Sequence, residues 1–436
     1  MPPSTEMRYF LKHDLLEKVS MSQDTLTHPR FHRMPFTLNR GNIAMTLLLL
    51  AVVLVLGSCR TREIVEEAYE PSASHEEYRR SLMAMELDDT ALGRAWLSQA
   101  DAALEAPHTI SIPFQEIAHF EPSRPEAVGF RFEALRGQRI EILLEIEDGE
   151  QGKMFADVFR AEEGGANALP QVASYSDELN RLEFEPRRDS EYILRLQPEL
   201  LRGGRYSVRI QSVPVMSFPV QDHGIRHIWS FFGDSRGGGT RVHEGVDVFA
   251  PRGTPVLSSV YGTVRNVGTR DLGGLVVSIT DEERGLVLYY AHLEEQLTQR
   301  GARVAPGDII GTVGNTGNAI TTPPHLHFGI YEPGWRAIDP WNFLYEFDTE
   351  PPAIAGATNK IGGAARVAVE GVSLMKTTPE AQAFSLSYDT PVVILGASAA
   401  SYRVVLQDGR TGYIPVGVLE ATDEPVRIAQ AFNAEP

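Results

Sequence analysis

The sequence predicts a mainly β protein of several domains, preceded by a short helical region. The chain has 436 residues, more than one ordinary hydrophobic core accommodates, so about two to four domains are expected. From residue 109 onward, short segments alternate polar and apolar residues, as strands with one buried face do. The composition, with 42% apolar and 22% charged residues, is that of an ordinary globular protein.

The charge balance restricts the possible partners. The net charge is −18, and an acidic chain is repelled by nucleic acid and by anionic lipid. We therefore expect no nucleic-acid partner.

The N-terminal segment is typical of an exported protein. An apolar run at residues 43–57 follows Arg33 and Arg40 and is too short for a comfortable membrane span. It ends in LGSC, which resembles the lipobox of bacterial lipoproteins and contains the single cysteine, Cys59. Residues 1–58 are thus predicted to be a signal peptide with a long leader, for which Met34 or Met45 is an alternative start. An ordinary signal peptide or a signal anchor with an incidental cysteine is the alternative.

The lipobox resemblance implies a location. A lipidated Cys59 would anchor the chain to a membrane of the cell envelope, on the periplasmic side. Arg60 stands where an aspartate would signal retention in the inner membrane, so the outer membrane is expected.

Two segments precede the histidine-rich part of the chain. Residues 59–108 are predicted to form a lipidated helical stalk, because Leu82, Met85, Leu92 and Trp96 recur at helical spacing. Residues 109–212 are predicted to form a β-sandwich, similar in outline to jelly-roll domains, since RIEI, YILRL and YSVRI read as strands separated by polar or glycine turns.

The remaining segments complete the predicted organisation. Residues 213–347 are rich in glycine, valine and short strands, among them a hairpin formed by LVVSI and LVLYY. Residues 348–360 contain two consecutive prolines and read as a linker. Residues 361–422 carry an Asp-Gly hairpin signal in YRVVLQDGRTGYIP and resemble bacterial Src-homology-type barrels, and residues 423–436 form a tail.

Three short segments concentrate histidine: RVHEGVDV, YYAHL and PPHLHFGIY. His243 and Asp247 lie four residues apart among β-branched residues, which favour extended chain over helix. In a strand, residues an even number apart point to one face, and the same holds for His325 and His327. The two pairs can therefore converge if their strands are neighbours.

This set of ligands suits zinc. Catalytic zinc takes imidazole and carboxylate as three protein ligands and keeps one position open. Calcium or magnesium would require more oxygen ligands. Iron held by two histidines and one carboxylate is chemically possible.

The histidine segments resemble the LytM, or lysostaphin-type, zinc endopeptidases, whose signatures are a His and an Asp four apart and a later His-x-His. The match runs through FGDSRGGGTRVHEGVDVFAPRGTPV, YYAHL, GDIIGTVGNTGNA and PPHLHFGIY. The resemblance implies one zinc ion held by His243, Asp247 and His327, with His292 and His325 as catalytic residues that do not bind the metal. It also implies an antiparallel β-sheet crossed by a groove, and hydrolysis of peptide bonds in peptidoglycan.

Further groove residues are expected around this set. The glycine-rich segment GTVGNTG, residues 311–317, is predicted to be a tight loop in the groove wall. Asn315 within it, Arg241 and Tyr290 are candidates for substrate contact. A turn-forming Asn, an exposed Arg and a packed Tyr are the alternatives.

Two other function classes remain open at this point. One is a non-catalytic envelope lipoprotein that binds peptidoglycan or activates another wall hydrolase, and the other is a structural lipoprotein. The resemblance favours the enzyme, because no signature residue is missing. The C-terminal barrel is expected to bind the wall or an envelope protein partner, and the bond that is cleaved is not predicted.

Overall fold

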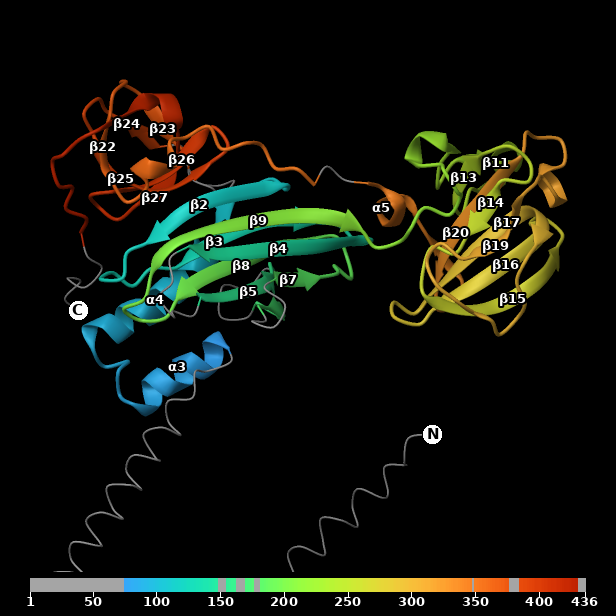
Figure 1. The fold of residues 1–436 in the computed structure, drawn as a ribbon, viewed down its shortest axis with the longest axis horizontal. Helices are drawn as coiled ribbons and strands as arrows, with labels where there is room; N and C mark the ends of the chain where they lie inside the picture. Colours follow the sequence, from blue (N-terminus) through green and yellow to red (C-terminus); the bar gives the residue numbers. More distant parts are fainter. Residues whose placement is uncertain are drawn as a thin grey trace, which may run out of the picture. The chain divides into compact units, whose positions relative to one another are not determined.

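The computed structural model describes residues 74–147, 154–161, 169–175, 181–346, 349–375 and 384–429. The predicted signal peptide with Cys59 lies outside these residues. Within them the secondary structure is mostly strand, which confirms the predicted mainly β class (Figure 1). None of the helices in the described ranges has the length and apolar character needed to cross a membrane.

Two helices open the described chain, α3 (His75–Ala84) and α4 (Ala91–Glu105). Ser74 caps the first in a capping box with Glu77, and Thr90 caps the second. The indole Nε1 of Trp96 donates to the carbonyl of Pro198, 2.8 Å away, so α4 is fastened to the sandwich.

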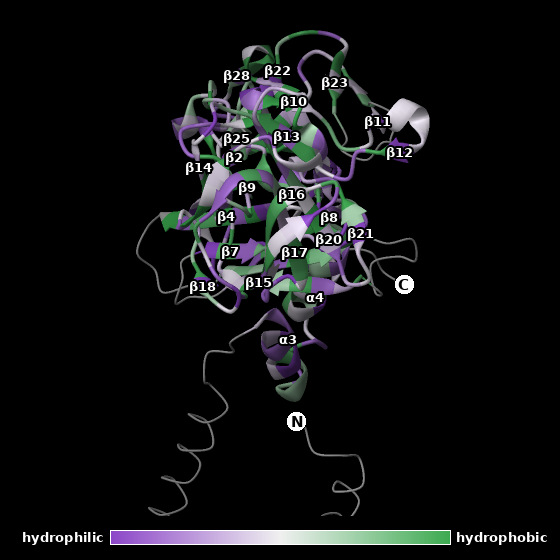
Figure 2. Cartoon of the chain, turned by 90° about the vertical axis from the view of Figure 1, so that its right-hand side faces the viewer, coloured by the Kyte–Doolittle hydropathy of each residue, from purple (hydrophilic) through white to green (hydrophobic). Residues whose placement is uncertain are grey.

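Polar residues dominate α3, which Figure 2 colours mostly as hydrophilic. Its contacts with α4 and the sandwich include His75, which stacks on Trp96 of α4 at 4.6 Å and hydrogen-bonds Gln197 of the sandwich at 2.7 Å. Leu82 is buried as expected, whereas Met85 ends the helix and is exposed. The described part of the predicted stalk is thus packed against the sandwich, because its few apolar side chains are buried there.

Two sheets form the sandwich, and Figure 1 shows them as two layers. One has the order β1-β3-β8-β5-β6 and the other contains β2-β9-β4-β7. Alternate residues of the two sheets, among them Phe130, Ile142, Leu194 and Val208, meet in one buried core. The strands are β1 (His108–Thr109), β2 (Phe114–Phe120), β3 (Val128–Ala134), β4 (Gln138–Glu147), β5 (Met154–Arg160), β6 (Gln171–Ser174), β7 (Arg181–Phe184), β8 (Ser190–Pro198) and β9 (Gly204–Pro214).

The C-terminal barrel is joined to the sandwich by a continuous sheet. Strand β25 pairs with β2 at Ile117↔Ala397 and Ala118↔Gly396. The barrel strands are β22 (Ala364–Val367), β23 (Val372–Leu374), β24 (Phe384–Leu386), β25 (Pro391–Ser398), β26 (Ser401–Leu406), β27 (Thr411–Pro415) and β28 (Leu419–Ala421). The expected hairpin around Asp408-Gly409 is confirmed, since β26 pairs with β27.

A buried ion pair lies at this junction. The guanidinium of Arg403 in the barrel lies 3.0 Å from the carboxylate of Glu116 in the sandwich, and both residues are buried. The hydroxyl of Tyr413 donates to the same carboxylate at 2.6 Å, and Arg403 also donates to the hydroxyl of Tyr206. The barrel is therefore fixed to the sandwich and is not a module that hangs from a free linker.

The histidine-rich segment folds around a twisted antiparallel sheet of order β10-β13-β20-β17-β16-β15-β18. Its elements are β10 (Ile228–Ser230), β11 (Ser235–Arg236), β12 (Arg241–Val242), β13 (Val246–Phe249), β14 (Pro255–Leu257), β15 (Gly262–Arg270), β16 (Gly274–Asp281), β17 (Leu286–Gln296), β18 (Arg303–Val304), β19 (Ile309–Val313), β20 (His325–Glu332), β21 (Arg336–Ile338) and α5 (Trp341–Leu344). Short 3-10 turns occupy Ile225–His227, Gly237–Gly239, Gly317–Ala319, Thr358–Lys360 and Val416–Val418.

Two expectations for this domain can be compared with the structure. The predicted hairpin is confirmed, because β16 and β17 pair antiparallel. The interpretation of residues 311–317 as a loop is wrong for its first three residues, which belong to β19. Gly311 is required there because a Cβ would lie 2.6 Å from the carbonyl oxygen of Glu295 on the neighbouring β17.

Candidate active site

Two neighbouring strands bring the predicted pairs together. Asp247 on β13 stands opposite His327 on β20, and Phe249 opposite His325. The alternate residues of β13, Val246 and Val248, are fully buried in the domain core. The apolar face of β13 thus fixes Asp247 on the opposite face.

His243 is positioned by a turn rather than by a strand. It lies between β12 and β13, and its backbone exchanges hydrogen bonds of 2.8 Å with Gly233 and Asp234. The carboxylate of Asp234 accepts from the backbone N–H of Phe231, which closes this turn. The expectation that His243 and Asp247 share one strand face is therefore wrong in detail, although both side chains reach one centre.

Gly245, between these two ligands, allows the close approach of β20. A Cβ at this position would lie 2.4 Å from the carbonyl oxygen of Phe328 and 2.8 Å from Cε1 of His327. Only a hydrogen atom fits there.

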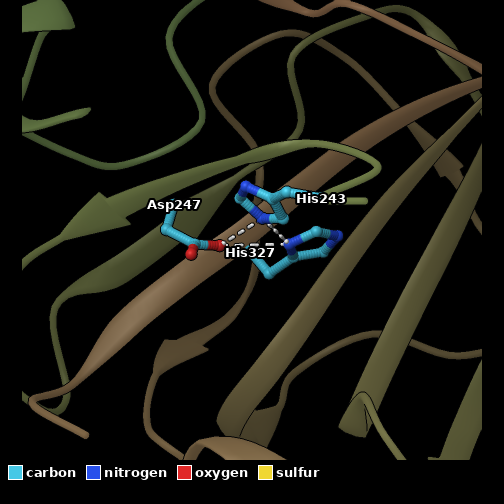
Figure 3. Close-up of side chains that lie close together, drawn as sticks. All are labelled: His243, Asp247 and His327. Carbon is cyan, nitrogen blue, oxygen red and sulfur yellow. Dashed lines mark hydrogen bonds and ion pairs between the residues drawn. The ribbon is translucent and has the colours of Figure 1, made fainter. Parts of the chain in front are cut away.

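Three polar atoms converge at the centre of the site (Figure 3). Nε2 of His243 lies 2.9 Å from Oδ1 of Asp247 and 2.9 Å from Nδ1 of His327. Nδ1 of His327 lies 3.1 Å from the same Oδ1. All three residues are largely buried, with 5 to 14% of each side chain exposed.

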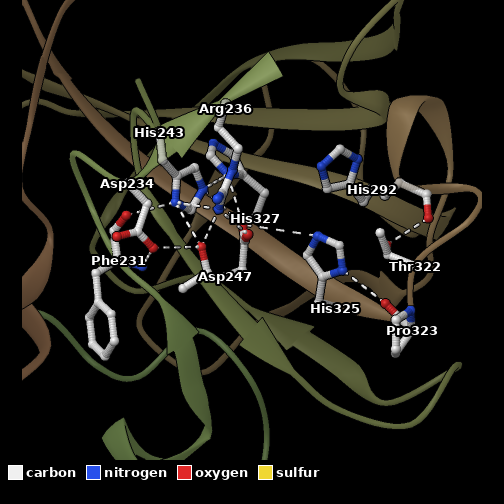
Figure 4. A network of polar contacts seen from close by, with 12 residues as sticks. Phe231, Asp234, Arg236, His243, Asp247, His292, Thr322, Pro323, His325 and His327 are labelled. Carbon is white, nitrogen blue, oxygen red and sulfur yellow. Dashed lines mark hydrogen bonds and ion pairs between the residues drawn. The ribbon is translucent and has the colours of Figure 1, made fainter. Parts of the chain in front are cut away.

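The outward atoms of two ligands are held by neighbours, as Figure 4 shows. Nδ1–H of His243 donates to the carbonyl of Phe231 at 2.9 Å, which leaves Nε2 with a lone pair that points to the centre. Arg236 donates to Oδ2 of Asp247 at 3.2 Å, and this leaves Oδ1 for the centre. Burial alone would raise the pKa of Asp247, but the adjacent imidazoles of His243 and His327 outweigh it and lower the pKa well below its usual range.

This donor set fits a zinc ion. Ligand atoms of a tetrahedral zinc site lie about 3.3 Å apart, given bond lengths of about 2.0–2.1 Å. The observed separations of 2.9 to 3.1 Å require only a slight widening. Two nitrogens and one carboxylate oxygen leave a coordination position open, and they offer too few oxygens for calcium or magnesium.

His292 and His325 lie beside this centre. Nδ1–H of His292 donates to the carbonyl of Thr316 at 2.8 Å, and Nδ1–H of His325 donates to the carbonyl of Pro323 at 2.9 Å. The Nε2 atom lies on the far side of each ring from this anchor, and the two ring centroids are 5.0 Å apart. Burial, together with the neighbouring His327 and His325, lowers the pKa of His292 to about 4, so His292 is a neutral base at neutral pH.

The backbone at His292 has an unusual conformation. Its φ is +63°, in the left-handed region, while its N–H donates to the carbonyl of Gly273. The pairing of β16 with β17 is irregular over the same stretch. Non-glycine residues in this region often lie at functional sites, where the surrounding structure holds them.

A groove of about 1610 Å³ contains all five residues. Other residues of its wall come from β12 and the residue pair after it, from the β15–β16 turn, from the segment before β20, and from an aromatic group on β17, on β20 and in the turn after β20. These include Arg241, Glu244, Arg270, Asp271, Asn318, Thr322, Tyr289, Tyr331 and Trp335.

The three further candidates from the sequence have different outcomes. Arg241 lines the groove and is exposed. Tyr290 is fully buried in the core, where its hydroxyl accepts from the backbone N–H of Ser259, so its interpretation as a groove residue is wrong. Asn315 does not line the groove and instead donates to the carbonyls of Ile320 and Thr322 in the adjoining turn.

Comparisons with known proteins agree with this arrangement. Residues 241–340 match the model of Peptidase family M23. The chain is 40% identical to the L-Ala--D-Glu endopeptidase of Bacillus subtilis over 134 residues, which is 28% of this chain and 40% of that protein. It is 36% identical to the peptidoglycan DD-endopeptidase ShyC of Vibrio cholerae over 91 residues, 21% of this chain and 20% of that protein. The chain thus contains a Peptidase M23 domain, which confirms the resemblance to the LytM, or lysostaphin-type, family.

Solved structures give matches of the same extent. The catalytic domain of lysostaphin from Staphylococcus simulans is 32% identical, covers 26% of this chain and 88% of its own, and has a TM-score of 0.25. LytU is 34% identical, covers 26% of this chain and 81% of its own, and also has a TM-score of 0.25. The curated relatives named above are matched over less than half of their own length.

Proposed function

We propose that this chain is a zinc-dependent endopeptidase that hydrolyses peptide bonds in peptidoglycan. The observation that supports this most directly is that one groove holds the His243, Asp247 and His327 centre beside two further histidines, each anchored through Nδ1 to a backbone carbonyl. The names of the relatives, an L-Ala--D-Glu endopeptidase and a peptidoglycan DD-endopeptidase, point to the same class of substrate.

His243, Asp247 and His327 would hold one zinc ion per chain. When bound there, zinc supplies a Lewis acid that polarises a carbonyl oxygen and lowers the pKa of water. Arg236 and the carbonyl of Phe231 keep the ligands oriented from behind.

His292 and His325 would move the protons. Each ring is anchored through its Nδ1–H to a backbone carbonyl, so its Nε2 stays aimed into the groove. One Nε2 accepts a proton from the attacking water, because a neutral imidazole is a suitable base near pH 7. That proton then passes to the amine that leaves as the peptide bond breaks, while the other ring, after it takes up a proton from solvent, donates to the oxygen that develops charge. The two roles can be exchanged between His292 and His325.

The second candidate is a non-catalytic envelope protein that binds peptidoglycan or activates another hydrolase. Such a protein needs neither a metal nor a histidine base. The buried ligand set and the two anchored imidazoles argue against it, since a buried polar cluster without a function is costly to keep.

Digestion of purified peptidoglycan by the full chain tests the proposal. Mass spectrometry of the products should reveal cut stem peptides or cross-links and identify the bond. The matched His292→Ala chain should release these products at least about 100-fold more slowly at the same concentration. Release of the same fragments by both proteins at the same rate would rule out the proposed catalytic site.

We also propose a lipid anchor at Cys59, which would hold the chain on the periplasmic side of the outer membrane. The support is the LGSC sequence after an apolar run. Cys59→Ala should release the protein from membranes or leave it unprocessed. An unmodified chain that keeps residues 1–58 in the cytoplasm would contradict the anchor.

The barrel is proposed to bind the wall or an envelope protein partner. Phe384 and Tyr388 expose 43% and 64% of their surface on the barrel, which is unusual for large aromatic side chains. Tyr388→Ala should weaken retention on isolated sacculi without a change in melting temperature. If Tyr388→Ala is retained on sacculi as well as the unsubstituted chain, this face of the barrel does not bind the wall.

A further inference from the structure

An aromatic row leads from the metal centre along the groove. The ring of Tyr289 on β17 lies 6.2 Å from that of His327, and the ring of Tyr331 on β20 lies 6.1 Å from that of Tyr289. Trp335, in the turn after β20, follows at 5.4 Å from Tyr331. All four side chains line the groove, so the row forms a continuous part of its wall.

Trp335, the last member of the row, is held in a strained and exposed position. Its φ is +61° and 55% of its surface is exposed. A bulky residue in the left-handed region costs about 1–2 kcal/mol, and so large an exposure recovers little of this by burial. Gly334 beside it already provides one positive φ for the turn, so the turn itself does not call for a tryptophan.

The neighbours of Trp335 fix the orientation of its ring. Tyr331 packs against it at an angle of 60°, and the guanidinium of Arg265 on β15 lies 5.7 Å from its centroid. Arg265 forms no ion pair with any residue in the described ranges, so its N–H donors are available beside the ring.

We propose that Trp335 and Arg265 form a subsite for a sugar ring of the glycan strand to which the cleaved stem peptide is attached. The inference rests on the proposed function, and it assigns a second ligand class besides the peptide to the end of the groove that Trp335 lines, with Arg265 just outside the groove lining. The C–H face of a sugar ring is apolar and stacks on the negative face of an indole. The adjacent guanidinium can donate to hydroxyl and N-acetyl oxygens.

The chemistry of peptidoglycan favours a sugar over a peptide side chain at this position. Stem peptides consist of alanine, glutamate and a diamino acid, none of which offers a large flat apolar surface. The sugar rings are the groups in this polymer that match an exposed indole in size and shape. The aromatic row reaches Trp335 from His327 in three steps of 5.4 to 6.2 Å. These steps set an upper limit on the distance from His327 to Trp335, and a stem of about four extended residues spans about 14 Å, so a sugar at the end of such a stem comes near the indole.

Equilibrium binding tests the subsite directly. The zinc-loaded His292→Ala chain is titrated calorimetrically with a muropeptide, which is a disaccharide with its stem peptide, and with the same peptide without sugar. The sugar should increase the affinity about tenfold, as expected for one stacked ring with hydrogen bonds beside it. Adding Trp335→Ala should bring the two affinities to within about twofold, and Trp335→Phe should keep part of the difference.

A matched control separates this effect from general loss of an exposed aromatic. Tyr261 belongs to the same domain, is 74% exposed and does not line the groove, so Tyr261→Ala should preserve the full difference. Equal affinities for the two ligands in the parent chain, or a difference that survives Trp335→Ala, would overturn the subsite. The proposed function is tested by a different experiment and fails if the zinc-loaded unsubstituted chain does not hydrolyse peptidoglycan. The binding comparison decides on the sugar subsite whatever the outcome of that experiment.

Discussion

Replacing Gly245 by alanine tests whether zinc binding depends on the close approach of the segment before β13 to β20. The added Cβ would lie 2.4 Å from the carbonyl oxygen of Phe328, whereas ordinary contact begins near 3.4 Å, so β13 and β20 must separate by about 1 Å. The same Cβ would approach the imidazole of His327 to 2.8 and 3.0 Å. A ligand displaced by about 1 Å leaves the geometry that a three-ligand site requires, and zinc affinity should fall about 10- to 100-fold.

Competition with a fluorescent zinc chelator measures this affinity at pH 7. Overpacking of the core should cost about 1–3 kcal/mol of unfolding free energy, so the domain should still fold, which a urea titration checks. Gly224→Ala is the matched control, because nothing lies within 4 Å of a Cβ there and its φ of −153° suits alanine. If the Gly245→Ala chain binds zinc as tightly as the Gly224→Ala chain, the strand spacing does not set the centre.

Three further predictions concern proton transfer, the barrel junction and pH. His292→Ala should retain about one zinc per chain and lose about two to four orders of magnitude in hydrolysis rate, whereas His243→Ala should lose both, as metal analysis and rate assays on the same samples would establish. Arg403→Met should lower the unfolding free energy by about 3–5 kcal/mol, because it leaves the buried carboxylate of Glu116 unpaired. In urea titrations, the double variant that also carries Glu116→Gln should recover part of this loss. Burial lowers the pKa of His75 to about 4, so below pH 6.5 the unfolded chain binds more protons than the folded chain. The contribution of neutral His75 to the unfolding free energy should therefore be present above pH 6.5 and be smaller by about 2 kcal/mol at pH 5. Unfolding monitored by tryptophan fluorescence should show that His75→Gln lacks this part of the pH dependence.

Spacing in the sequence pairs His243 with Asp247 and His325 with His327, whereas the roles of these residues and of His292 are what the resemblance to the LytM-type family implies. Histidine is rare in this chain, and even spacing within β-branched segments indicates a common face. The structure places Asp247 and His327 opposite each other on neighbouring strands, a register that one sequence cannot specify. It also places His243 in a turn, since the hydrogen bonds that hold it come from residues about ten positions earlier.

Cross-strand neighbours explain what the sequence could not predict. Arg236 lies within the segment that resembles the family, yet its role depends on the carboxylate of Asp247 across the site. Tyr331 belongs to β20 beside β17, so its contact with Tyr289 follows from sheet order rather than from spacing. The isolated position of Trp335 after a Pro-Gly pair gives no periodic signal at all.

The barrel junction shows the same limit over a longer range. Glu116 sits in an alternating strand, a pattern in which a charged residue is normally exposed to water. Here its carboxylate is fully buried because β25 and β26 of the barrel cover it, and its partner Arg403 lies 287 positions later. The proline-containing linker before the barrel does not predict the pairing of Arg403 with Glu116, because the sequence of a linker does not determine where the following domain packs.

Backbone strain connects the proposed chemistry with the proposed sugar subsite. His292 and Trp335 have φ values of +63° and +61°, and both side chains line the groove. His292 cannot relax without losing either its backbone bond to Gly273 or its imidazole bond to Thr316, so the kink is what turns the ring out of β17 and toward the centre. A left-handed residue costs about 1–2 kcal/mol, and such a cost is retained where a side chain must point in one direction. At His292 that direction is toward the ligand set, and at Trp335 it is along the groove, where a substrate larger than a peptide would lie.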